Sequence, residues 1–77
     1  MNERVAMDIE LEQPLDESRR AWLDAKLAAA RGIVLALFDP DDPRRLHVEY
    51  QPAAFSPETL LDFIAEHGVR GQPVRAT

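Results

Sequence analysis

Four polar residues fall at spacings that could gather them on one face of a sheet. His47 and Glu49 are two positions apart in an alternating segment, and Asp8 and Glu10 are two apart in another. Alternate residues of a strand point to the same side, so paired strands would align these side chains. Imidazole and carboxylate groups can ligate a divalent metal, but solvated cross-strand charge pairs are the commoner arrangement, which we favour. Nearby carboxylates also predict a raised pKa for His47.

Other side chains that could carry chemistry form no recognisable site. The chain has no cysteine, which excludes thiolate catalysis and thiolate metal sites. Ser18 and Ser56 stand at the starts of helix-like segments, without a histidine–acid pair nearby in the sequence. The aspartates of residues 39–43 lack the glycine and distal glutamate of an EF-hand loop, so we predict a turn there. We expect no enzyme, no catalytic residue, no metal ligand set and no cofactor.

Charge and length limit the partners. The chain has 77 residues, a formal net charge of −5 and few aromatic residues. An acidic surface repels nucleic acid and anionic lipid, so we expect neither as a partner. The longest apolar stretch, residues 33–38, is too short to cross a bilayer, and no signal-peptide pattern is seen. These features predict a single cytoplasmic domain over residues 1–77.

Periodicity predicts four strands that position the polar residues. Alternation of apolar and polar residues indicates strands over residues 5–11 and 46–50, and a continuous apolar run indicates another over 33–38. Residues 72–77 can supply a last short strand. That strand should lie at an edge, because Pro73 has no N–H to donate to a neighbouring strand.

Two helices are expected between the strands. The first follows Asp16, a good N-cap, and continues to about residue 31. The second follows Ser56, with a proline in the first helical position. Gly32 and Gly68 can end these helices because glycine adopts the left-handed conformation at little cost.

The resulting order of elements is β-α-β-β-α-β. With right-handed crossovers, the compact solution is a four-stranded antiparallel sheet in the order 4-1-3-2 with both helices on one face. This α+β arrangement is the ferredoxin-like fold, which hosts many functions. The expected core consists of the inward positions of these elements, which are Val5, Met7, Ile9, Leu23, Leu27, Phe38, Val48, Tyr50, Leu60 and Ile64.

Several segments resemble heavy-metal-associated domains, the modules of copper chaperones and metal-ATPase N-termini. These segments are Gly32-Ile33 with the strand that runs to Phe38-Asp39, the strand 46–50, and residues 56–69 with the sequence SPETLLDFIAEHGV. The resemblance covers nearly the whole chain and implies the ferredoxin-like scaffold.

The metal-binding motif of that family is missing here. The family carries Met-x-Cys-x-x-Cys between the first strand and the first helix, and counting back from Gly32 places its cysteines at Asp16 and Arg19. Neither side chain replaces a soft thiolate in binding Cu(I). The loop could remain a docking surface, but an ordinary helix cap with an exposed salt bridge is the interpretation we favour.

The apolar run 33–38 cannot turn every side chain toward the core. If Ala36 and Phe38 point inward, Leu35 and Leu37 lie on the open face of an edge strand. Together with Val34 they form a candidate interaction surface. Cover by neighbouring loops is an equally good explanation.

We therefore interpret the chain as a heavy-metal-associated-like domain without the thiolate site that serves as a protein-interaction or regulatory module. Its partner would be another, unknown protein, or a second copy in weak self-association. Two alternatives stay open. One is a metal-binding or metal-transport accessory protein with histidine and carboxylate ligands, and the other is a ferredoxin-like domain that senses a small molecule.

Overall fold

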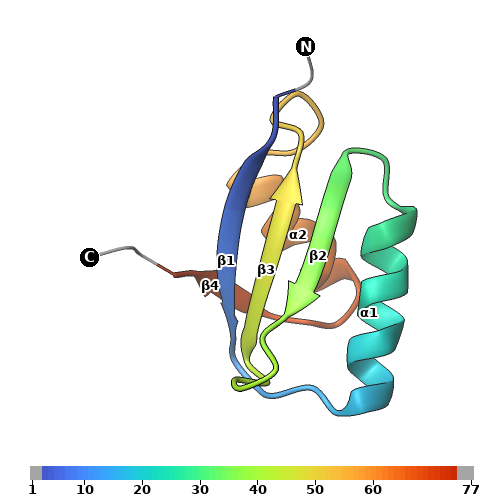
Figure 1. Cartoon of the computed structure of the whole chain (residues 1–77), viewed down its shortest axis with the longest axis vertical. Coiled ribbons are helices and arrows are strands. Elements are labelled where there is room, and N and C mark those ends of the chain that lie inside the picture. The colour runs from blue at the N-terminus through green and yellow to red at the C-terminus, as the bar shows by residue number, and fades with distance from the viewer. Residues whose placement is uncertain (1–2, 75–77) are drawn as a thin grey trace.

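A computed structural model describes residues 3–74 as one sheet with two helices packed on it (Figure 1). The predicted order of elements is confirmed: β1 (Val5–Leu11), α1 (Glu17–Ala29), β2 (Ile33–Phe38), β3 (Arg45–Tyr50), α2 (Pro57–Glu66) and β4 (Gly71–Pro73). The last predicted strand is shorter than expected, and residues 75–77 of that prediction lie outside the described residues.

The sheet is antiparallel throughout and has the order β2-β3-β1-β4. Read from the other edge, this is the predicted order 4-1-3-2. β1 and β3 form the centre, where Met7 lies opposite Val48 and Ile9 opposite Leu46. β4 lies at an edge, as the proline at position 73 predicts.

Both helices begin at the predicted caps. The Asp16 side chain accepts a hydrogen bond from the backbone N–H of Arg19 at 2.8 Å. Ser56 and Thr59 form a reciprocal capping box, which satisfies two N–H groups at the start of α2. Gly32 has φ +101° and Gly68 has φ +80°, so both glycines adopt the left-handed conformation after a helix. α1 ends two residues before the predicted end, because Ala30 already has extended dihedral angles.

One apolar core lies between the sheet and the helices. β1 and β3 turn alternate residues toward it, and each helix contributes one buried stripe. Figure 1 shows α2 behind the centre of the sheet and α1 alongside β2, with which it is in contact. The buried residues are Met7, Ile9, Leu11, Leu23, Leu27, Leu46, Val48, Tyr50, Leu60, Ile64 and Val69.

The predicted core was wrong at Val5 and incomplete elsewhere. Val5 has the same parity as Met7 but is 40% exposed, because it begins β1 at the end of the sheet, beyond the last buried position of the strand. Phe38 packs against the core without being fully buried. Leu11, Leu46 and Val69 belong to the core although the expected list omitted them.

A β-bulge interrupts the pairing of β2 with β3. Ile33 lies opposite Tyr50 and Leu35 opposite Glu49, so Val34 has no partner in the register. The extra residue changes which face the start of the strand presents. Without the bulge, Ile33 would share the open face with Leu35, whereas here it packs against the core.

Candidate functional site

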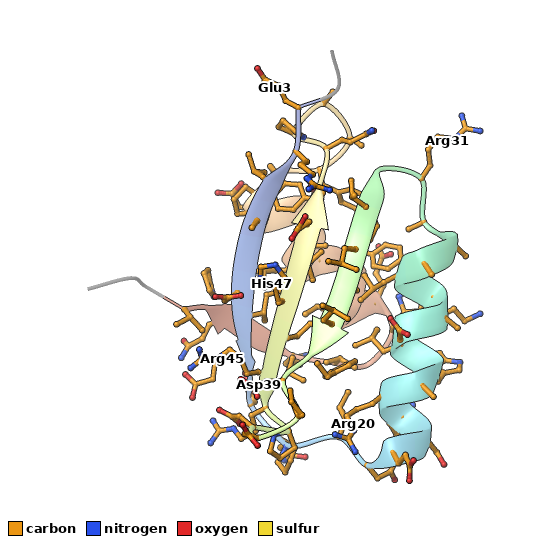
Figure 2. The ribbon with its side chains drawn as sticks, viewed as in Figure 1. Glu3, Arg20, Arg31, Asp39, Arg45 and His47 are labelled. Carbon is orange, nitrogen blue, oxygen red and sulfur yellow. The ribbon has the colours of Figure 1, made fainter. Side chains whose placement is uncertain are left out.

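The candidate site is the open face of the sheet, opposite the helices. Cross-strand register builds two rows on it, Ala6–Glu49–Leu35 and Asp8–His47–Leu37. Each row therefore runs from the central strand β1 across β3 to the edge strand β2. Polar groups occupy the middle of the face and leucines its border. Figure 2 shows His47 at the middle of the sheet, on β3.

His47 is held between two carboxylates, as the sequence spacing predicts for Asp8. Its Nδ1 lies 2.7 Å from Asp8 Oδ1, and its Nε2 lies 3.1 Å from Glu49 Oε2. Arg4 Nε lies 3.4 Å from the other oxygen of Glu49. Hydrogen bonds to Asp8 first, and then to Glu49, raise the pKa of His47 above its ordinary value of 6.5.

Glu10 does not join this cluster. It lies opposite Arg45, one row away from His47, and its Oε1 is 3.6 Å from Arg44 Nη2. Because Glu10 lies two positions after Asp8, the sequence correctly predicts that both side chains are on the same face. Parity fixes the face but not the row, so the four-residue cluster expected from the sequence contains three members.

The three members do not converge on a point where a metal ion could sit. The imidazole ring of His47 stands between Asp8 and Glu49, and each ring nitrogen already faces one carboxylate. A metal ligand must present a free lone pair to the ion, and ligands must share one centre. Within residues 3–74, no group of three histidine, cysteine or carboxylate residues could hold a metal ion.

The apolar part of the face lies along β2. The exposed fractions are 43% for Val34, 38% for Leu35 and 54% for Leu37. Ala36 and Phe38 lie opposite Val48 and Leu46, residues of the core, so the alternation predicted for the strand holds beyond the bulge. Within the described part of the chain, loops leave these three side chains accessible.

The two positions at which the sequence resemblance would place cysteines, Asp16 and Arg19, have structural roles. Asp16 caps α1, as expected, by accepting the backbone N–H of Arg19, but the expected salt bridge between the two side chains is not formed. The guanidinium of Arg19 turns away from Asp16. It lies 4.9 Å above the Trp22 ring and places Nη2 3.5 Å from the carbonyl oxygen of His67.

A cluster around Trp22 was not predicted from the sequence. Trp22 is 38% exposed, and its ring lies between Arg19 and Lys26, whose Nζ is 5.8 Å from the ring centroid. His67 meets the ring edge-on at 5.5 Å and also contacts the ring of Phe63, tilted by 42° at a centroid distance of 4.6 Å. The i, i+3 and i+7 spacing of the three α1 residues could have shown that they share a face. Only the packing of the helices brings His67 to it.

The turn between β2 and β3 is also as predicted. Asp39 Oδ1 accepts a hydrogen bond from the N–H of Asp41 at 2.8 Å, and Asp42 Oδ1 accepts one from the N–H of Arg44 at 3.0 Å. Aspartates that bond to the backbone two residues later stabilise turns. Their carboxylates are therefore used within the loop.

No protein-family model matches the chain, and no curated protein is significantly similar to it. The resemblance to heavy-metal-associated domains therefore depends only on the segments quoted from the sequence. No helix among the described residues is long and apolar enough to span a membrane.

Proposed function

We propose that this chain is a small protein-interaction domain that receives an extended segment of a partner protein along β2. One observation carries the proposal: an edge strand of six apolar residues exposes Val34, Leu35 and Leu37. Folded proteins usually shorten, charge or cover such an edge, because it invites pairing with another chain. An apolar edge that is left accessible is a recognised mark of a binding surface.

The backbone of β2 supports docking by strand addition. Asp39 donates its N–H to the carbonyl oxygen of Arg45 at 3.0 Å. Antiparallel pairing alternates, so Leu35 and Leu37 direct their backbone groups to β3, whereas Ala36 and Phe38 direct theirs outward. A partner strand would pair with these outward groups, and its side chains would pack on the two leucines.

The expected affinity is modest. Burying two leucine side chains is worth roughly 3–6 kcal/mol by water-to-apolar transfer. The loss of translational and rotational freedom offsets part of this gain. A domain with this surface suits a reversible partner better than a permanent one.

The proposed scaffold is a ferredoxin-like domain related to heavy-metal-associated modules, without their thiolate chemistry. Strand order and helix placement support the scaffold. Asp16 and Arg19, where the family has its cysteines, support the loss of Cu(I) binding. We also propose a cytoplasmic location. The acidic net charge supports the absence of a nucleic-acid partner. The metal-accessory alternative gains no support from His47, since both ring nitrogens are engaged.

Peptide selection tests the proposal. Random peptides displayed on phage are selected against the chain, and the binders are measured on Leu35→Lys/Leu37→Lys and on Val5→Lys. Val5 is exposed to a similar extent but lies at the far end of the core side of β1, which makes it a matched control. We expect the double variant to lose at least about tenfold in affinity and the control to retain it. Equal binding to all three proteins, or no selectable binder, would contradict the proposal.

A further inference from the structure

A shallow hollow of about 320 Å³ lies on the open face where β2 turns into β3. Leu37 and Pro40 supply its apolar wall, and Phe38 also borders it. Arg45 and His47 lie along the β3 side. Figure 2 shows Arg45 nearer this turn than His47 is. The hollow thus combines apolar contact with a guanidinium group on a face that is open to solvent.

Arg45 is the unusual member of the hollow. Its Nε is buried without a hydrogen-bond partner, and no carboxylate among residues 3–74 lies within 4 Å of its guanidinium nitrogens. Buried polar atoms are nearly always hydrogen-bonded, so the orphaned Nε marks a guanidinium that the protein itself leaves unsatisfied. The adjacent Arg44 shows the contrast, since its Nε donates to Leu11 O at 2.9 Å and its Nη2 pairs with Glu10.

The carboxylates of the hollow are already used by other groups. Asp8 Oδ1 lies 2.7 Å from His47 Nδ1, and Asp39 Oδ1 accepts the N–H of Asp41. The raised pKa of His47 favours its cationic form, which offsets the charge of Asp8. Arg45 therefore remains the group of the hollow that has charge and hydrogen-bond donors to offer.

We propose that this hollow binds a small carboxylic acid with an apolar substituent. The carboxylate would accept hydrogen bonds from the two Nη groups of Arg45, since Nε is buried, and the planar guanidinium can present these two groups to two carboxylate oxygens. The substituent would pack on Leu37 and Pro40. This inference goes beyond the proposed function, because it needs no partner protein. The hollow shares Leu37 with the proposed docking surface but does not use Val34 or Leu35.

An NMR titration with phenylacetate as the probe tests the site. Amide and methyl shifts are followed in the wild-type chain, in Arg45→Gln and in Arg44→Gln, which removes the same charge one residue away. We expect saturable shifts at Leu37 and Arg45 with a dissociation constant on the order of millimolar, as for other ligands of about ten heavy atoms. Arg45→Gln should weaken binding about tenfold, and Arg44→Gln less than about twofold.

Two further probes separate the contributions of charge and apolar contact. Neutral phenylacetamide should not bind measurably, and acetate should bind more weakly than phenylacetate because it lacks the ring. Leu35→Lys changes the proposed docking surface but not the lining of the hollow, so it should leave phenylacetate binding intact. A failed peptide selection would therefore not contradict the hollow, and a failed titration would not contradict the docking surface. No saturable shift at Leu37, equal loss in both arginine variants, or equal binding of phenylacetamide would overturn the proposal.

Discussion

The two edges of the sheet are built in opposite ways. β4 is three residues long, and its exposed positions are Gln72 and Pro73. β2 is six residues long, wholly apolar, and exposes side chains on its outer face. A short strand that contains proline resists pairing with another chain, whereas a long apolar strand invites it. This contrast indicates that only one edge of this domain is protected against association.

The two edge strands also share one device, because each begins at or next to a tightly packed glycine. A Cβ at Gly71 would lie 2.7 Å from Ile9 Cγ2, and a Cβ at Gly32 would collide with Ala54 Cβ. Both strands are therefore anchored at their starts by close packing. They differ in the length and the side chains of the strand beyond the glycine.

The largest expected effect is a difference in stability between substitutions on the two faces of the sheet near the β2 edge. Leu46→Ala should lower the free energy of unfolding by about 2–5 kcal/mol, because Leu46 is fully buried and its loss leaves a cavity. Leu37 lies opposite His47, the residue that follows Leu46, and points to the open face, so Leu37→Ala should cost less than about 1 kcal/mol. Urea denaturation of both variants measures the difference. Similar losses would mean that Leu37 is part of the core.

Gly32→Ala tests the anchor of β2. We expect a loss of about 2–4 kcal/mol, from the positive φ and from the collision with Ala54. Gly68→Ala is the control, because it also has positive φ but its Cβ would meet only Arg19 Nη2, at 3.5 Å. It should cost about 1–2 kcal/mol. Thermal unfolding of the two variants compares their losses of stability, and the difference reports the cost of the packing collision at Gly32. Equal losses of stability would mean that the collision with Ala54 contributes nothing.

Sedimentation tests whether the unprotected edge pairs with itself. We expect the wild-type chain to self-associate weakly at high concentration and Leu35→Lys/Leu37→Lys to remain monomeric. The double variant should change stability by less than about 1 kcal/mol, since both side chains are on the surface. If both proteins are monomeric and the variant is as unstable as a core mutant, the leucines are buried and the face is not an interface.

The smallest effect concerns the polar centre of the face. The pKa of His47 is raised in the folded state by Asp8 and Glu49, so its contribution to stability is complete below the unfolded value of 6.5 and is lost as pH rises through the folded pKa. His47 is partly exposed, which screens the pairs and limits the contribution to less than about 1 kcal/mol. NMR titration of wild type and of Asp8→Asn measures the His47 pKa in each protein, and the pKa should be lower in the variant. A His47 pKa at or below 6.5 in wild type would contradict this prediction.

The sequence was sufficient for the elements and their caps because those signals are local. Asp16 and Ser56 mark helix starts, and alternation over 46–50 assigns each residue to a face. It also placed His47 beside Asp8, because the predicted strand order made β1 and β3 neighbours. The expected family remains a proposal because it rests only on the segments quoted from the sequence. The expected function remains a proposal because it depends on a partner and not on local signals.

The features that the sequence did not reveal depend on long-range packing. Glu10 shares a face with Asp8, yet the row that it occupies is set by the register between strands. The contact of His67 with Trp22 depends on how two helices sit on one sheet. No residue type marks Val34 as the bulge, because valine is an ordinary strand residue.

The bulge at Val34 has a consequence for how the chain folds. A slip of β2 by one residue would turn Leu35 and Leu37 inward and Ala36 and Phe38 outward. In most strands such a slip buries polar groups, but here both faces are apolar, so hydrophobicity barely distinguishes the two pairings. The bulge and the close contact at Gly32 must select the native one. β2 is therefore a point of local frustration, where apolar burial alone does not separate the native pairing from one shifted by a single residue.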